Sequence, residues 1–185
     1  MIYFTSDTHF GHDREFIYGP RGFKNLHNME NTIITNWNKT VKPEDEVYLI
    51  GDFFLGTDLD FVRNTIDNLN GSIHIIRGNH DTDAKIDLYK NLAKIIDVEW
   101  AKVIRGGGRS FYLSHYPTLT ADLNSSPKHT VYNLFGHTHS KKKFYEDRPY
   151  MYNVAVDAHN FTPVSIDEIN EDINAEIKNC IRFLV

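Results

Sequence analysis

The sequence predicts one domain of the α/β class, in which two β-sheets pack face to face and helices lie outside them. In the first half of the 185 residues, short apolar runs typical of strands alternate with apolar stripes typical of helices. The second half is richer in short strands. Five of the expected strands are followed directly by Asp, Asn or His, which places these polar side chains where α/β sheets usually bind ligands.

The first half is expected to contain three strands, each a short apolar run that stops at Gly or at a polar residue: residues 2–6, 46–50 and 73–77. Three helices are expected from apolar residues at helical spacing: residues 28–40, 59–69 and 83–96. Thr57 is a candidate N-cap of the second helix, and Asn70 with Gly71 would end it.

The second half reads as strands followed by one helix. Residues 98–105 and 110–114 are expected to form a hairpin across a Gly-rich turn, and residues 130–135 another strand. Residues 150–156 and 161–165 are expected to form a further strand pair. Ser165 and Glu168 have the spacing of a capping box, so a final helix should begin there.

Composition excludes several classes of protein. A formal net charge of -5 argues against a broad basic surface for duplex nucleic acid. Cys180 is the single cysteine, so no intramolecular disulfide can form. The chain shows no secretory signal and no apolar run long enough for a membrane span, so a cytoplasmic location without membrane contact is expected. Ten His and many Asp favour a metal site built from N and O donors, which suits Mn, Fe or Zn.

The polar residues after the five strands form short motifs. Each motif alone is weak, because Asp-x-His or Gly-Asp arises easily by chance in a chain of this composition. Their joint occurrence and their order carry the information. In chain order the motifs are Asp7-x-His9, Gly51-Asp52, Gly78-Asn79-His80-Asp81, Ser114-His115 and Gly136-His137-x-His139.

In this order the motifs resemble those of the calcineurin-like metallophosphoesterases. The segments 6–12 and 153–165 resemble the small single-domain bacterial and phage-type branch of that family. The resemblance implies a four-layer sandwich of two mixed β-sheets flanked by helices, with a binuclear metal site at the strand ends. It also implies that Asp52 bridges two divalent ions, Mn²⁺ by expectation, with Fe, Zn or Ni as alternatives. Asp7, His9 and His139 would complete the first metal site, and Asn79, His115 and His137 the second.

The expected reaction is hydrolysis of a small phosphomonoester or phosphodiester, nucleotide-derived esters included, by a hydroxide that bridges the metals. An extended backbone would direct Asp7 and His9 to one side, and likewise His137 and His139. His80, which follows Asn79, is the expected general acid. Asp81 would either orient His80 or N-cap the following helix.

Several alternatives stay open from sequence. The chain could instead be a nuclease on single-stranded nucleic acid, or a non-catalytic scaffold of the same fold. Asp157 and His159 could form a metal pair, but a surface or supporting role is favoured. Two roles are open for each of the remaining residues. His12, Arg14, Arg77 and Lys141 either contact the substrate phosphate or are charges in solvent. Phe53 and Phe54 either stack a base or pack in the core. Loops 11–23 and 117–128 would select the leaving group. The sequence does not predict an oligomeric state.

Overall fold

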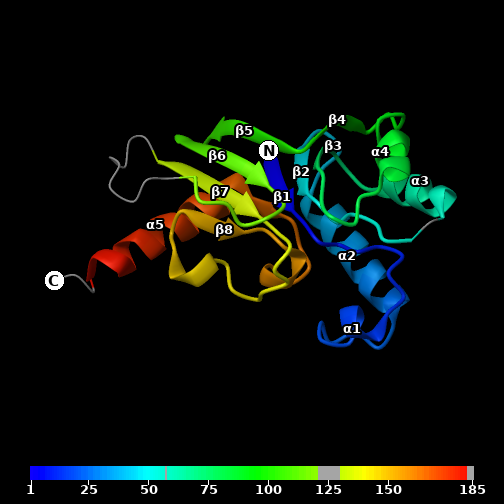
Figure 1. Cartoon of the computed structure of the whole chain (residues 1–185), viewed down its shortest axis with the longest axis horizontal. Coiled ribbons are helices and arrows are strands. Elements are labelled where there is room, and N and C mark those ends of the chain that lie inside the picture. The colour runs from blue at the N-terminus through cyan, green and yellow to red at the C-terminus, as the bar shows by residue number, and fades with distance from the viewer. Residues whose placement is uncertain (57, 121–129, 183–185) are drawn as a thin grey trace.

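Two mixed β-sheets with flanking helices make up the fold in the computed structural model, which describes residues 1–56, 58–120 and 130–182 (Figure 1). The larger sheet has the strand order β4-β3-β2-β1-β9 and the smaller one β5-β6-β7-β8. The strands of the larger sheet are β1 (Ile2–Thr5), β2 (Glu46–Ile50), β3 (Ser72–Ile76), β4 (Ile95–Glu99) and β9 (Val164–Ser165). Those of the smaller sheet are β5 (Ala101–Gly106), β6 (Arg109–Ser114), β7 (Val131–Phe135) and β8 (Met151–Asn153). The predicted sandwich is therefore confirmed.

Strand direction brings the polar motifs together. Strands β1, β2, β3 and β4 run parallel, and only β9 runs antiparallel to its neighbour. In the smaller sheet β6, β7 and β8 are parallel, and β5 is antiparallel to β6. The carboxyl ends of parallel strands lie at one edge of a sheet, so each sheet presents its motif residues along a single edge.

Two apolar clusters hold the layers together. The helices are α1 (Glu15–Tyr18), α2 (Leu26–Thr40), α3 (Leu59–Asn68), α4 (Asp83–Tyr89) and α5 (Ile166–Arg182), with short 3₁₀ turns η2 (Tyr145–Asp147) and η3 (Val156–Ala158). One cluster joins α2, α3 and α4 to one face of the larger sheet, with Trp37 and Phe53 among its fully buried side chains. The other cluster joins the opposite face to the smaller sheet and α5, with Phe4, Phe111 and Ile169 at its centre. None of the helices in the described part of the chain is long and apolar enough to cross a membrane.

Side chains cap the helices close to the predicted positions. The Asn25 side chain accepts a hydrogen bond from the Asn28 amide, so α2 begins two residues earlier than predicted. Asp58 caps α3 by accepting from the amides of Asp60 and Phe61, whereas Thr57 lies outside the described residues. The capping box at α5 is confirmed, because the Glu168 amide donates to Ser165 Oγ at 3.2 Å and the Ser165 amide donates to Glu168 Oε2 at 2.9 Å.

Two predictions about the middle of the chain are wrong. The helix expected over 83–96 ends at Tyr89, because the chain from Ile95 onward pairs with β3 as an additional parallel strand. The strand expected over 98–105 is divided between β4 and β5, which belong to different sheets and are separated only by Trp100. Ile95 and Val98 suit a helical face as well as a strand, and pairing with β3 decides between them.

The strand pair expected over 150–156 and 161–165 is also wrong. Strand β8 pairs with β7 in the smaller sheet, and β9 pairs with β1 in the larger one. A run of apolar residues indicates extended backbone but does not choose the neighbouring strand, so sequence adjacency was a poor guide here.

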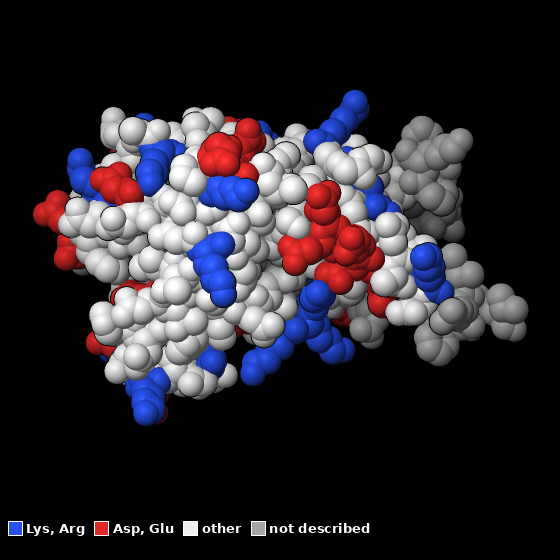
Figure 2. Space-filling view, turned by 180° about the vertical axis from the view of Figure 1, so that it is seen from behind, with Lys and Arg blue, Asp and Glu red and all other residues white. Residues whose placement is uncertain are grey.

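Surface charge is unevenly distributed. On the face shown in Figure 2, acidic side chains gather over α5, which carries Asp167, Glu168 and Glu171, whereas Lys and Arg are scattered. The described part of this face therefore has no continuous positive surface of the kind that binds duplex phosphates.

Candidate metal centre

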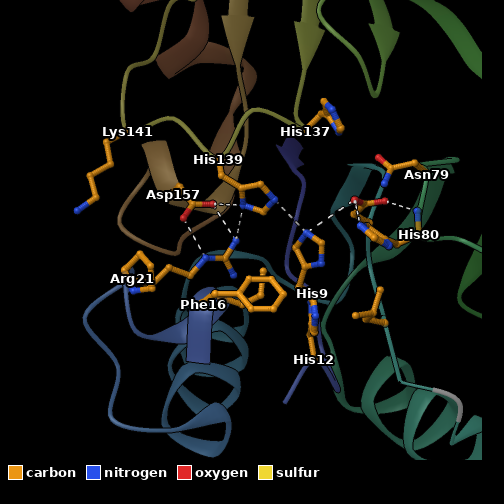
Figure 3. Close-up of a pocket in the computed structure, with 14 residues that line it drawn as sticks. His9, His12, Phe16, Arg21, Asn79, His80, His137, His139, Lys141 and Asp157 are labelled. Carbon is orange, nitrogen blue, oxygen red and sulfur yellow. Dashed lines mark hydrogen bonds and ion pairs between the residues drawn. The ribbon is translucent and has the colours of Figure 1, made fainter. Parts of the chain in front are cut away.

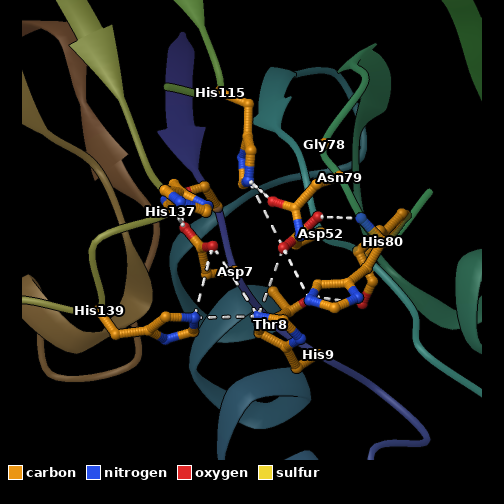
Figure 4. Close-up of polar contacts among 12 residues, drawn as sticks. Asp7, Thr8, His9, Asp52, Gly78, Asn79, His80, His115, His137 and His139 are labelled. Atoms are coloured by element: carbon orange, nitrogen blue, oxygen red, sulfur yellow. Dashed lines mark hydrogen bonds and ion pairs between the residues drawn. The ribbon is translucent and has the colours of Figure 1, made fainter. Parts of the chain in front are cut away.

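Two groups of potential metal ligands lie side by side at the carboxyl ends of the strands (Figure 4). In the first group, ligand atoms of Asp7, His9 and His139 all lie within 4.8 Å of one another. The second group is Asp52, His115 and His137, with the same limit. Asn79 joins the second group, because its Oδ1 lies 2.9 Å from His115 Nε2. The structure thus brings together all seven residues that the sequence proposed as ligands.

Backbone pairing continues past the strands and holds the ligand loops in register. The Asp7 amide donates to the Gly51 carbonyl at 3.0 Å, and the His9 amide donates to the Asp52 carbonyl at 3.1 Å. The loops after β1 and β2 therefore run together, as their strands do. The loop after β7 is attached to them by Asp7, whose Oδ2 accepts the His137 amide at 2.9 Å.

The first group surrounds a carboxylate oxygen that has no hydrogen-bond donor. Asp7 Oδ2 accepts from Ser6 Oγ at 2.6 Å, but the buried Oδ1 has no partner. His9 Nε2 and His139 Nε2 both lie 3.9 Å from Oδ1, and these two nitrogens lie 3.2 Å apart. A buried carboxylate oxygen without a partner is costly, and two imidazole nitrogens directed at the same point fit a shared cation. The residues present therefore suit a divalent metal with N and O ligands.

Asp52 faces both groups. Its Oδ2 lies 3.5 Å from His115 Nε2 in the second group and 3.7 Å from His9 Nε2 in the first. The Ile50 carbonyl accepts a hydrogen bond from His115 Nδ1 at 3.0 Å, which leaves Nε2 directed at Asp52. A carboxylate in this position can serve two cations at once.

The pKa values reflect this crowding of buried charges. Burial alone would raise the pKa of Asp52, but the hydrogen bond and charge of His115 outweigh it and hold the pKa at about 2. Burial would lower the pKa of His115, but the carboxylates of Asp52 and Asp7 raise it to about 9. Burial dominates at His9 and lowers its pKa to about 2, so His9 is neutral. A histidine must be neutral to bind a metal, so a proton on His115 would compete with one.

Five of the proposed ligands have left-handed backbone conformations: Asp7, His9, Asp52, His137 and His139, with φ between 49° and 66°. The expectation that an extended backbone directs Asp7 and His9, or His137 and His139, to one side is therefore wrong. Left-handed residues other than glycine cost of order 1–3 kcal/mol each and gather at functional sites. Here the conformation turns successive side chains back into one centre.

Glycines precede three of the ligands because the loops approach one another closely. A Cβ on Gly78 would overlap Asp52 Oδ1 and lie 2.5 Å from the Asp52 amide nitrogen. A Cβ on Gly136 would overlap Asp7 Oδ2 and Ser6 Oγ. The Gly in the Gly-Asn-His and Gly-His-x-His motifs thus allows the loops of neighbouring strands to meet.

His80 lies at the mouth of the centre, on a turn rather than on an extended segment. Its amide donates to Asp52 Oδ1 at 2.9 Å, and its ring Nε2 lies 3.9 Å from Asp52 Oδ2. The side chain is 42% exposed, so the ring reaches solvent while its backbone is held beneath. The position allows contact with a bound substrate.

Both expected roles of Asp81 are wrong. Among the described contacts the Asp81 carboxylate makes no hydrogen bond to the His80 ring, and Thr82 rather than Asp81 occupies the N-cap position of α4. Instead, the buried Asp81 Oδ2 accepts the Gly78 amide at 2.8 Å and the Asp52 amide at 3.0 Å. Asp81 thereby fastens the loop after β3 to the loop after β2 and positions Asp52.

An open cavity of about 680 Å³ lies over the ligands (Figure 3). His12 and Lys141 line it, as do Phe16, Ile17 and Pro20 from the predicted specificity loop 11–23, whereas Arg14 does not. Phe53 and Phe54 are fully buried in the core, so they pack there and are not available to stack a base. Residues 121–128 of the second predicted loop lie outside the described residues.

Sequence reasoning missed Arg21, which lies buried beneath the first ligand group. Its guanidinium forms two hydrogen bonds with Asp157, at 2.9 and 2.8 Å, and a third with the Asp7 carbonyl at 2.8 Å. Asp157 Oδ2 in turn lies 3.3 Å from His139 Nδ1. Asp157 therefore lies where it can orient His139, which fits the expected supporting role, and His159 instead contacts the Asn153 carbonyl at 2.8 Å. No motif in the sequence pointed to Arg21.

Replacing Asp157 with Asn should weaken metal binding at one of two sites. The carboxylate fixes the ring of His139, and loss of such a partner typically costs about 10–100-fold in metal affinity. Titration of Mn²⁺ by calorimetry measures this, with Asp60→Asn on the exposed start of α3 as the matched control. Two sites of unchanged affinity in Asp157→Asn would show that Asp157 does not support His139.

Comparison with known proteins gives consistent matches over most of the chain. A sequence profile described as the calcineurin-like phosphoesterase superfamily domain matches residues 1–155. The uncharacterized protein MJ1445 of Methanocaldococcus jannaschii is 34% identical over 173 residues, which cover 91% of this chain and 88% of that protein. The gene 66 protein of Mycobacterium phage D29 is 29% identical, with 94% and 96% covered. The crystal structure of a protein of unknown function from Aquifex aeolicus, AQ665, superposes with a TM-score of 0.71 at 28% identity and covers 92% of this chain and 98% of its own.

Proposed function

We propose a phosphoesterase activity from the premise that the chain belongs to the calcineurin-like phosphoesterase superfamily, whose profile matches residues 1–155. The proposed reaction is hydrolysis of a small phosphomonoester or phosphodiester at a centre of two divalent metal ions. The observation that carries the proposal is the position of Asp52 Oδ2, 3.7 Å from His9 in one ligand group and 3.5 Å from His115 in the other.

In this proposal Asp7, His9 and His139 would hold one metal, Asn79, His115 and His137 would hold the other, and Asp52 would be available to both. Nitrogen and oxygen donors without thiolate suit Mn²⁺, with Fe, Zn or Ni as alternatives. When bound, two such ions supply a water of lowered pKa as nucleophile and neutralise charge on the phosphoryl oxygens.

The protein's own residues position the substrate and handle the proton. The His80 ring, exposed at the mouth of the cavity, donates a proton to the oxygen of the leaving group. Asp81 accepts hydrogen bonds from the Asp52 and Gly78 amides and so joins the two ligand loops that carry Asp52 and Asn79. The cavity of about 680 Å³ is of the size that holds a small organic ester.

The complete ligand set supports an enzyme over a non-catalytic scaffold. A scaffold that had lost its chemistry would have no reason to keep five left-handed ligand residues at a cost in stability. The alternative that the protein is a nuclease on single-stranded nucleic acid is tested by the assays described next. A cytoplasmic location and the absence of membrane partners stay predictions.

Metal analysis followed by paired assays tests the proposal. The purified protein, reconstituted with Mn²⁺, should bind two ions per chain and hydrolyse p-nitrophenyl phosphate, bis(p-nitrophenyl) phosphate or both. Treatment with a chelator should abolish turnover, and Mn²⁺ should restore it. Two bound metals without turnover on either ester, and without cleavage of single-stranded oligonucleotides, would favour the scaffold instead.

A further inference from the structure

A second cavity, of about 320 Å³, adjoins the second ligand group, because His115 and Asn79 both line it. It is lined by residues that include Arg77, Asn79, Trp100, His115, Tyr116 and Thr118. Asn79 lines this cavity and the first one, so the two meet at a proposed metal ligand. A phosphorus atom held at the ligands would therefore lie close to both cavities.

The second cavity has exposed aromatic walls. Trp100 is 72% exposed and Tyr116 is 52% exposed, and both line this one cavity, so they form an exposed aromatic surface rather than scattered single residues. Trp100 lies at the short crossing between β4 and β5, and the Arg77 guanidinium covers one face of its indole, with Cζ 4.5 Å from the ring centroid. The Tyr116 ring lies 4.6 Å from the ring of His137 and 5.2 Å from that of His115. Tyr116 thus lies against the second ligand group, and Trp100 lines the same cavity.

Aromatic side chains and stacked guanidinium planes bind other planar rings, nucleobases above all, with little dependence on the identity of the base. Arg77 also forms an ion pair with Asp83, whose Oδ1 lies 2.6 Å from its Nη2, while its guanidinium lies over the indole of Trp100. Such a surface suits a planar group rather than a flexible alkyl chain.

The position of His80 distinguishes the two cavities. Among the described residues, His80 lines the first cavity and not the second. If His80 protonates the leaving oxygen, the leaving group must lie in the first cavity. In an in-line displacement the attacking and leaving oxygens lie on opposite sides of phosphorus, so the ester group that stays on phosphorus points away from the leaving group. The second cavity is available for that ester group.

We propose that the Arg77–Trp100–Tyr116 cavity binds the ester group that stays on phosphorus, and that this group carries a planar aromatic ring, of which a nucleoside is the biological example. The inference rests on the proposed phosphoesterase function and narrows its substrate to a phosphodiester. Water adds to phosphorus, the bond to the leaving oxygen breaks, and the products are an alcohol and a monoester that still carries the aromatic group.

Two diesters with one leaving group test this assignment: p-nitrophenyl thymidine 5′-phosphate and ethyl p-nitrophenyl phosphate. The Mn²⁺-loaded protein should have a higher kcat/KM for the thymidine ester, and Trp100→Ala should lower the ratio of the two values by about 10-fold or more. Trp100→Phe, which keeps an aromatic face, should restore most of the ratio. Ile96→Ala removes another exposed apolar side chain from neighbouring β4 and should leave the ratio unchanged.

Fluorescence provides a second measurement that needs no turnover. The chain has two tryptophans, and Trp37 is fully buried while Trp100 is exposed. Thymidine 5′-monophosphate, the expected product, should quench the emission of Trp100 in the Mn²⁺-loaded protein, and inorganic phosphate should not.

Hydrolysis of both diesters with a ratio that Trp100→Ala does not change would overturn the cavity assignment and leave the proposed function intact. Equal quenching of Trp100 emission by thymidine 5′-monophosphate and by phosphate would also overturn the cavity assignment and leave the proposed function intact. Absence of turnover on every ester would instead contradict the proposed function. The quenching experiment would then test, without any activity, whether the cavity binds an aromatic ring.

Discussion

Asp52→Asn is expected to lose turnover by on the order of 10³-fold or more, because charge stabilisation by metals is worth several kcal/mol and each 1.36 kcal/mol is tenfold in rate. Among the described residues, Asp52 is the one carboxylate within 3.7 Å of ligand nitrogens of both groups, so no described neighbour can supply its charge. Asparagine keeps the shape of the side chain and one oxygen that can accept the hydrogen bond from the His80 backbone amide. Mn²⁺ content should fall below two ions per chain.

The control for Asp52→Asn is Asp167→Asn, which makes the same chemical change on exposed α5. Both variants should keep the circular dichroism spectrum of the parent protein, so that loss of activity cannot be attributed to unfolding. Turnover of Asp52→Asn close to that of the parent would be incompatible with a shared carboxylate and with the two-metal site.

His80→Ala is expected to lower turnover by about 10²–10⁴-fold on an ester with an alkyl leaving group, with two metals still bound. Alanine keeps the backbone amide that donates to Asp52 Oδ1, so the ligand loop should stay in place. On a p-nitrophenyl ester the loss should be much smaller, because p-nitrophenolate leaves without being protonated. The comparison of the two esters separates proton donation from a general structural effect.

His27→Ala, on the exposed surface of α2, is the matched control for His80→Ala. An equal loss on alkyl and p-nitrophenyl esters would argue that His80 binds the phosphate rather than protonating the leaving group. Loss of metal from His80→Ala would instead place His80 among the ligands.

Much of the site could be predicted from the sequence because the ligands lie close to strand ends. Asp52 and His115 each follow a short apolar run within two residues, and parallel strands bring such ends to one edge. The same local rule could not find Arg21, since its role depends on contact with Asp157, 136 residues away in the chain. It also could not define Asp81, whose carboxylate accepts the Gly78 amide on its own loop and the Asp52 amide on the loop after β2.

The errors in the fold have the same physical origin. Local spacing identified the first three strands and the helices α2 and α3, where one buried face repeats regularly. It failed between Tyr89 and Ala101, where pairing with β3 and the passage to the second sheet override local preference. It failed again at β8 and β9, because the choice of partner strand is made by contacts distant in sequence.

The left-handed ligand residues have a consequence for how the protein's stability depends on its surroundings. Asp7, His9, Asp52, His137 and His139 hold unfavourable backbone angles in the folded chain. A ligand that binds only the folded state adds to folding free energy in proportion to the logarithm of its concentration. The metal supply of the environment should therefore set how resistant the chain is to heat and proteases, so that one centre would govern both catalysis and lifetime.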